Sequence, residues 1–129
     1  MANELVLIVE DNDKNRKLAR DVLQFNGYRT IESITAEEGI QLALEQQPAL
    51  ILMDFQLPGM NGIEALGKLR GDPATQAIPV IVVTASAMTE DRLKIMAAGF
   101  DALQTKPIRV KEFVEVVASV IARHKGKAA

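Results

Sequence analysis

The 129-residue sequence contains no cysteine, no tryptophan and one histidine. The absence of cysteine excludes disulfides and thiolate chemistry and suits a reducing compartment. With His124 as its only histidine, the chain has no imidazole cluster for a metal or a catalytic triad, and we expect no phosphohistidine donor within it. The N-terminus also lacks a long apolar run. Its run Leu5–Val9 is too short for a signal peptide or a membrane span. We therefore expect a cytoplasmic protein without membrane contact.

The charges show only a slight acidic excess. Fifteen basic and 17 acidic residues give a net charge of -2 and a pI of about 5.4. Direct contact with nucleic acid usually requires a basic face, so we do not expect it here. The length and the 48% share of hydrophobic residues fit one globular domain with a sizeable core. We expect this domain at residues 1–125 and a frayed tail at 126–129.

Short apolar runs divide the chain into five similar units. These runs do not alternate with polar residues, which is typical of parallel strands buried on both faces. We predict strands at Leu5–Val9, Tyr28–Ile31, Leu50–Met53, Val80–Val83 and, more weakly, Ala102–Leu103.

Amphipathic stretches separate the apolar runs and predict five helices. Their buried faces are expected to include Leu18, Val22 and Phe25; Ile40, Ala43 and Leu44; Ile63, Leu66 and Leu69; Leu93, Met96 and Ala97; and Val110, Phe113, Val114, Val117 and Ile121. Asp13, Thr35 with Glu38 as a capping box, and Thr89 are the start signals, and Gly27 and Gly99 are stop signals. The strand–helix unit repeated five times predicts a doubly wound α/β fold.

Polar residues stand at the carboxyl ends of four predicted strands, where open parallel sheets bind ligands. Glu10 and Asp11 follow the first strand, Asp54 the third, Thr84 the fourth and Lys106 the fifth. Three neighbouring carboxylates repel one another, and one ammonium cannot neutralise them. Mg²⁺ prefers carboxylate and water ligands, so the pattern predicts a magnesium site.

The turn after the first strand excludes a nucleotide-binding fold. Such folds need glycines there, so that backbone N–H groups can hold phosphate. Residues 10–15 contain no glycine and three acids, which would repel a phosphate unless a cation intervened.

Asp54 is the best candidate for the reactive group. It directly follows a buried strand, and a carboxylate can attack phosphorus to form an acyl phosphate. Mg²⁺ and Lys106 would offset the charge on the phosphoryl oxygens, and the Thr84 hydroxyl could bond the product. Taken singly, the two acids at 10–11 read as solvated loop residues, Lys106 as a surface lysine and Thr84 as a strand-end hydroxyl. Their placement at one sheet edge favours the site.

Four segments resemble the receiver domain of bacterial two-component response regulators, the CheY-like superfamily. They are residues 7–12, 51–62, 83–85 and 105–108, and the likeness extends from about Leu5 to Arg123. The resemblance implies a flavodoxin-like five-stranded parallel sheet in the order 2-1-3-4-5 and a cis bond before Pro107. It also implies a phospho-acceptor switch rather than an enzyme, with slow autodephosphorylation.

Site roles follow from the resemblance, position by position. Asp54 would be phosphorylated by a histidine kinase or a histidine phosphotransfer protein. Asp11 would bind Mg²⁺ directly, Glu10 mainly through water, and Gln56 through its backbone carbonyl. Lys106 would contact the phosphoryl group. Thr84 would move toward it, and Gln56 and Ser86 would tune the phosphate lifetime.

Since the given chain ends after the fifth helix, we expect output through protein contacts. The first helix would dock the donor, and the fourth helix, fifth strand and fifth helix would bind a target. Leu103 stands where the family usually has an aromatic residue, which puts this coupling in doubt and keeps open a degenerate receiver acting as a constitutive scaffold. An aspartyl phosphatase is a weaker alternative, because such enzymes typically carry a second aspartate where Gln56 stands.

Overall fold

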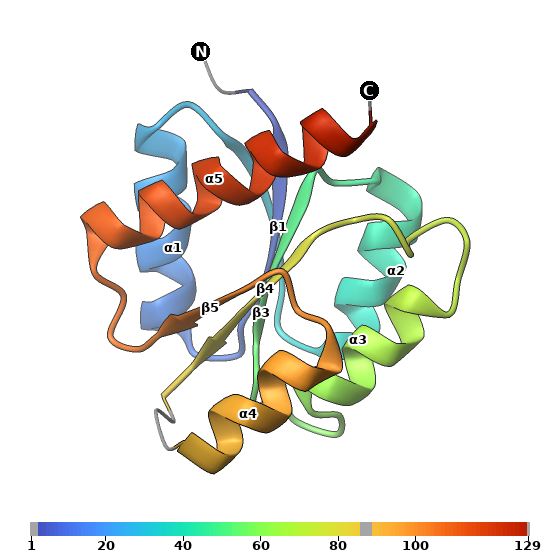
Figure 1. Ribbon diagram of the computed structural model, residues 1–129. Coiled ribbons are helices and arrows are strands. Elements are labelled where there is room, and N and C mark those ends of the chain that lie inside the picture. Colours follow the sequence, from blue (N-terminus) through green and yellow to red (C-terminus); the bar gives the residue numbers. More distant parts are fainter. Residues whose placement is uncertain (1–2, 86–88, 129) are drawn as a thin grey trace.

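Strands and helices alternate along the chain, as the apolar runs predicted. A computed structural model describes residues 3–85 and 89–128, and for residues 89–91 and 125–128 it describes the backbone alone. The strands are β1 (Leu5–Val9), β2 (Arg29–Ser33), β3 (Leu50–Asp54), β4 (Val80–Thr84) and β5 (Ala102–Thr105). The helices are α1 (Asp13–Phe25), α2 (Ala36–Gln46), α3 (Gly62–Arg70), α4 (Thr89–Ala98) and α5 (Val110–Ala128) (Figure 1).

The five strands form one parallel sheet in the order β2-β1-β3-β4-β5. This order confirms the one implied by the resemblance. Helices α1 and α5 cover one face of the sheet, and α2, α3 and α4 cover the other (Figure 1). The cis peptide bond expected between Lys106 and Pro107 is also present.

The core lies on both faces of the sheet because successive strand residues point in opposite directions. In β1, Leu7 and Val9 pack under the face covered by α2, α3 and α4, whereas Val6 and Ile8 pack under α1 and α5. All four side chains are at most 2% exposed. Burial on both faces explains why this strand reads as an unbroken apolar run.

The N-caps of the helices use the expected residue types, but they differ in detail from the predicted start signals. The N-cap of α1 is Asn12, whose side chain accepts a hydrogen bond from the Asn15 N–H, so the start signal expected at Asp13 was one residue late. Thr35 caps α2 by accepting from the Glu38 N–H, which is half of the predicted capping box. The full box occurs at the start of α3, in a segment without such a prediction. The Thr89 side chain lies outside the described residues.

The structure corrects several predicted helix faces. In α1, Phe25 is 91% exposed, and Leu18 is also exposed, because the buried side chains are Ala19, Val22 and Leu23. In α4, Ile95 is fully buried, while Leu93, Met96 and Ala97 face solvent. Val110, the first residue of α5, is exposed as well.

The carboxyl end of the chain continues as helix. Helix α5 extends to Ala128. Residue 129 lies outside the described residues, and the frayed tail at 126–129 stays a prediction. Within the described part of the chain, no helix is long and apolar enough to cross a membrane.

Candidate functional site

Four strand ends meet at one edge of the sheet and bring the predicted site residues together. In the register of the sheet, Val9 pairs with Met53, Asp54 with Val83, and Thr84 with Thr105. Glu10 directly follows β1, and Asp54 is the last residue of β3. Neighbouring parallel strands that end together therefore place the carboxylates side by side, although 44 positions separate them in the chain.

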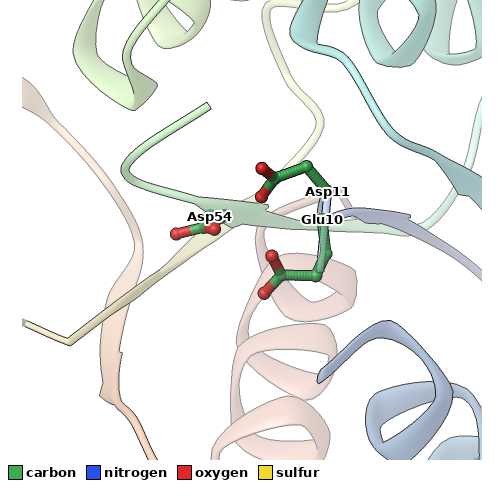
Figure 2. A group of neighbouring side chains, drawn as sticks. All are labelled: Glu10, Asp11 and Asp54. Atoms are coloured by element: carbon green, nitrogen blue, oxygen red, sulfur yellow. The ribbon is translucent and has the colours of Figure 1, made fainter. Parts of the chain in front are cut away.

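Glu10, Asp11 and Asp54 form a compact acidic cluster. Each offers one carboxylate oxygen, and these oxygens all lie within 4.8 Å of one another (Figure 2). Glu10 and Asp54 are each 6% exposed, whereas Asp11 is exposed. The cluster thus has two acids held in the protein and one that faces the solvent.

Lys106 bridges the two buried acids. Its Nζ lies 3.0 Å from Glu10 Oε1 and 3.1 Å from Asp54 Oδ2. Its backbone N–H donates to the carbonyl of Thr84 at 2.9 Å, which ties the end of β5 to the end of β4. The lysine is therefore positioned by the sheet as well as by its ion pairs.

Burial and proximity shift the ionisation of the bridged groups. Desolvation, reinforced by the neighbouring Asp54, raises the pKa of Glu10 to about 7, although the hydrogen bond from Lys106 opposes the shift. Desolvation lowers the pKa of Lys106, but its bonds to Glu10 and Asp54 outweigh this effect and raise the pKa overall. The Lys106 ammonium therefore stays charged, and Glu10 holds its proton to a higher pH than a solvent-exposed glutamate does.

The donor set fits a hard divalent cation. Three oxygen donors converge, and a single ammonium offsets only part of their charge. Within the ranges that the structure covers, no cation pairs with Asp11. Carboxylate oxygens with room for water are the ligands that Mg²⁺ takes in proteins.

Of the remaining predicted residues, Gln56 contacts Asp54 and Thr84 ends the adjacent strand β4. The Gln56 N–H donates to Asp54 Oδ1 at 3.2 Å, so the Gln56 peptide borders the cluster. Thr84 is buried at the end of β4, with its carbonyl bonded to Lys106. Ser86 lies outside the described residues. Leu103, in β5, packs partly buried against the core.

Two residues at the site escaped the sequence reasoning. The Asn12 N–H donates to Glu10 Oε2 at 3.2 Å, and its side chain caps α1. An asparagine just before an amphipathic stretch is a known cap signal that could have revealed it. Arg16 donates from Nη1 to the Glu10 carbonyl at 3.0 Å. No local signal marks this contact, because it depends on how α1 packs beside β1.

A parallel five-stranded α/β domain with an acidic cluster and a lysine at the carboxyl edge of its sheet belongs to the CheY-like fold class. A family model described as "Response regulator receiver domain" matches residues 6–118. The chain therefore belongs to the response regulator receiver family and is a receiver of two-component signalling. This confirms the receiver fold and the role in two-component signalling that the resemblance implied.

Curated proteins similar to the chain are also response regulators. The polar-differentiation response regulator DivK of Brucella ovis is 45% identical over 116 residues, which cover 90% of this chain and 94% of DivK. The DivK of Brucella melitensis matches equally.

Two solved structures are also similar. A CheY-like receiver domain protein from Methanospirillum hungatei aligns with a TM-score of 0.88 at 27% identity, covering 97% of this chain and 98% of that one. The receiver domain of a Pseudomonas aeruginosa sensor histidine kinase has a TM-score of 0.86 at 28% identity, covering 93% and 98%, with a magnesium ion coordinated in its active-site cleft.

Proposed function

We propose that the chain is a Mg²⁺-dependent phospho-acceptor and that Asp54 carries the phosphoryl group. The observation that carries this proposal is the cluster of three carboxylates within 4.8 Å, two of which share Lys106. Asp54 is the acid at the centre of the sheet edge, next to the Gln56 N–H and the Lys106 ammonium. A structural ion pair alone would not need the third acid, Asp11.

The proposed step transfers a phosphoryl group from a phosphohistidine of a histidine kinase or histidine phosphotransfer protein. A carboxylate oxygen of Asp54 attacks phosphorus, the P–N bond breaks, and its electron pair stays on the imidazole nitrogen, which then takes a proton. Lys106 would turn from Asp54 Oδ2 toward the phosphoryl oxygens. Thr84, at the adjoining strand end, would donate its hydroxyl to one of them.

Asp11, Asp54 and the Gln56 carbonyl would hold Mg²⁺, and Glu10 would contact it through water. When bound, the ion offsets negative charge on the phosphoryl oxygens. The chain supplies the nucleophile and its orientation, because β3 and the Gln56 N–H fix the Asp54 carboxylate. Hydrolysis of the acyl phosphate by water, slow in this proposal, would return the switch to its starting state.

Intact-mass analysis after incubation with acetyl phosphate and Mg²⁺ tests this proposal. We expect the mass of one phosphoryl group on the wild type and none on Asp54→Asn. Asp72→Asn is the matched control, because Asp72 lies in the loop after α3 at the opposite edge of the sheet. An unmodified wild type would instead support a constitutive scaffold, and steady turnover of phosphate esters would support a phosphatase.

We also propose where the partners bind. The donor would dock on α1, beside the acidic cluster. A protein target would bind the surface of α4, β5 and α5, where a groove of about 590 Å³ is present. Its lining residues are Arg92, Ala102, Leu103, Gln104, Thr105, Glu112, Glu115, Val116, Ser119, Val120 and Arg123.

Phosphorylation would shift a pre-existing equilibrium of this surface. NMR shifts in the groove should change with beryllofluoride and Mg²⁺, and their constancy would contradict the switch.

A further inference from the structure

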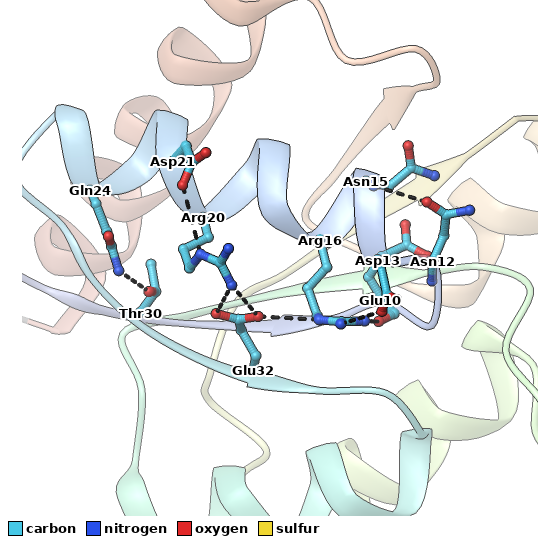
Figure 3. Close-up of polar contacts among 10 residues, drawn as sticks. All are labelled: Glu10, Asn12, Asp13, Asn15, Arg16, Arg20, Asp21, Gln24, Thr30 and Glu32. Carbon is cyan, nitrogen blue, oxygen red and sulfur yellow. Dashed lines mark hydrogen bonds and ion pairs between the residues drawn. The ribbon is translucent and has the colours of Figure 1, made fainter.

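Arg16 in the first turns of α1 joins three separate parts of the chain. Its guanidinium donates from Nη1 to the Glu10 carbonyl at 3.0 Å and from Nε to Glu32 Oε1 at 3.2 Å, and it pairs with Asp13 (Figure 3). Only 17% of its side chain is exposed. One side chain thus connects the end of β1, the strand β2 and the start of α1.

The contact with Glu10 fixes the peptide group that leads into Asp11. The peptide unit is planar, so the Glu10 carbonyl oxygen and the Asp11 Cα move together. The Glu10 N–H already donates to the Ser33 carbonyl at 3.0 Å. With Arg16 on the carbonyl, both polar backbone groups of Glu10 are bonded. The position of the Asp11 Cα, from which the side chain leaves the backbone, is therefore fixed.

The other side of Asp11 is held as well. The Asn12 N–H donates to Glu10 Oε2, and the Asn12 side chain accepts from the Asn15 N–H at the start of α1. Asp11 itself is exposed. Its position therefore depends on the two bonded residues that flank it in the chain.

Glu32 anchors Arg16 from the neighbouring strand. The carboxylate of Glu32 also accepts two hydrogen bonds from Arg20 Nη1, both at 3.0 Å. Arg20 shares this anchor but has no hydrogen bond to the turn between β1 and α1. The planar guanidinium of Arg16 presents donors in a fixed fork, so it reaches Glu32 and the Glu10 carbonyl at once, which a lysine ammonium on a flexible stem cannot reproduce.

We propose that Arg16 is a positioning residue for the cation site, acting through the Glu10 carbonyl on Asp11. This inference rests on the proposed function, because it takes the acidic cluster as a Mg²⁺ site. Partners outside the ligand shell that orient the ligands typically change metal affinity by about 10- to 100-fold when removed.

The sign of the effect separates positioning from simple electrostatics. Arg16 carries a positive charge near three carboxylates, so its removal should strengthen Mg²⁺ binding if charge alone matters. If Arg16 positions Asp11, its removal should weaken binding. Asp13 and Glu32 already offset much of the guanidinium charge, which favours the second outcome.

Calorimetric Mg²⁺ titrations test the proposal, with the Asp11 amide followed by NMR as a second readout. We expect Arg16→Met and Arg16→Lys each to raise the Mg²⁺ Kd about 10-fold and to shift the metal-free Asp11 amide signal. Arg20→Met is the matched control, since it removes an equal charge from Glu32 without touching the turn. We expect its Kd to stay within about twofold of the wild type.

Each outcome decides between the two proposals. If the wild type binds Mg²⁺ and both Arg16 variants bind it as well or better, Arg16 has no positioning role and the proposed function stands. An Arg20→Met loss as large as that of Arg16→Met also overturns the positioning role. A wild type that binds no Mg²⁺ overturns the proposed metal site itself. Thermal scans in EDTA verify folding, and if Arg16→Met does not fold, Arg16→Lys decides.

Discussion

Lys106 shares its charge between two acids that a metal ion would also use. Its Nζ is 3.0 Å from Glu10 and 3.1 Å from Asp54. An ammonium between carboxylates competes with a cation for them, yet the same ammonium would favour the negative phosphoryl oxygens during transfer. Metal affinity and phosphorylation rate should therefore respond to its loss in opposite directions.

We expect Lys106→Met to bind Mg²⁺ more tightly than the wild type but to accept phosphate about 100-fold more slowly. Titration calorimetry and timed intact-mass measurements with acetyl phosphate would give the two values. Lys111→Met is a suitable control, because Lys111 is exposed on α5 and makes no ion pair with the cluster. Weaker Mg²⁺ binding by Lys106→Met would show that the lysine organises the site rather than competing for it.

The raised pKa of Glu10 makes the stability of the metal-free protein depend on pH. Its pKa is raised from 4.5 to about 7 by burial and by Asp54. Between these values the folded chain binds more protons at Glu10 than the unfolded chain, so the free energy of unfolding falls as pH rises. The loss begins near pH 4.5, is complete above about pH 7, and is on the order of 3 kcal/mol.

Urea unfolding in EDTA at several pH values measures this contribution. Glu10→Gln cannot titrate, so the difference between wild type and variant isolates the glutamate. We expect the stability of the wild type relative to Glu10→Gln to decrease from pH 4.5 to 7. A difference that stays constant over this range would mean that Glu10 ionises normally.

Sequence reasoning could identify the site residues whose place depends only on where strands end. Glu10 and Asp54 directly follow apolar runs, Lys106 directly follows β5, and parallel strands that end at one edge bring such residues together. Arg16 could not be identified in this way. Its long side chain reaches Glu10 and Glu32 only because α1 packs beside β1 and β2, and no local pattern encodes that packing.

At the scale of the elements, two helical glycines should respond oppositely to the same substitution. Beyond its neighbours in the helix, a Cβ on Gly67 in α3 would meet no atom of the described residues within 4 Å, so Gly67→Ala gains helix propensity without a clash. A Cβ on Gly39 in α2 would lie 2.7 Å from Val9 Cγ2, in the buried core. That contact requires a shift of a packed side chain.

We expect Gly67→Ala to stabilise the fold by about 0.5–1 kcal/mol and Gly39→Ala to destabilise it by about 1–3 kcal/mol. Chemical denaturation of both variants beside the wild type gives the two differences. Because the substitutions are identical, their opposite signs would isolate the packing of α2 on β1. Stabilisation by both would mean that α2 can move away from the sheet at little cost.

Strands were easier to predict than helix faces, for a physical reason. A strand buried on both sides, such as β1, β3 or β4, needs only a run of apolar residues. The edge strands β2 and β5 are only partly buried and extend past the runs at Tyr28–Ile31 and Ala102–Leu103. A helix must also have its buried stripe assigned. In α4 the apolar residues are spread around the helix, so the sequence pointed to Leu93 and Met96, while packing buries Ile95. In α1 the apolar Leu18 and Phe25 lie along one flank of the buried stripe.

At the scale of the whole molecule, the acidic cluster joins segments that are distant in the chain. Asp11 comes from the turn after β1 and Asp54 from the end of β3, so an ion held by both ties separate parts of the fold together. A ligand that binds only the folded chain stabilises it, by about 2.7 kcal/mol at a concentration 100 times its Kd. Mg²⁺ should therefore raise the unfolding midpoint, and EDTA should reverse the effect.

Asp11→Asn should separate the two contributions of this residue to stability. Asp11 is exposed, and within the described ranges no cation pairs with it. Removing its charge relieves repulsion with Glu10 and Asp54 in the metal-free chain. We therefore expect the variant to be as stable as the wild type or more stable in EDTA, but to gain almost nothing from Mg²⁺.

Thermal unfolding of both proteins, with and without Mg²⁺, measures the two effects in one experiment. Asp21→Asn provides the control, because Asp21 is an exposed acid on α1 whose partners are Lys17 and Arg20. It should keep the full response to Mg²⁺. If Asp11→Asn kept that response too, the ion would bind without this carboxylate. If it were less stable in EDTA, Asp11 would hold the turn together rather than strain it.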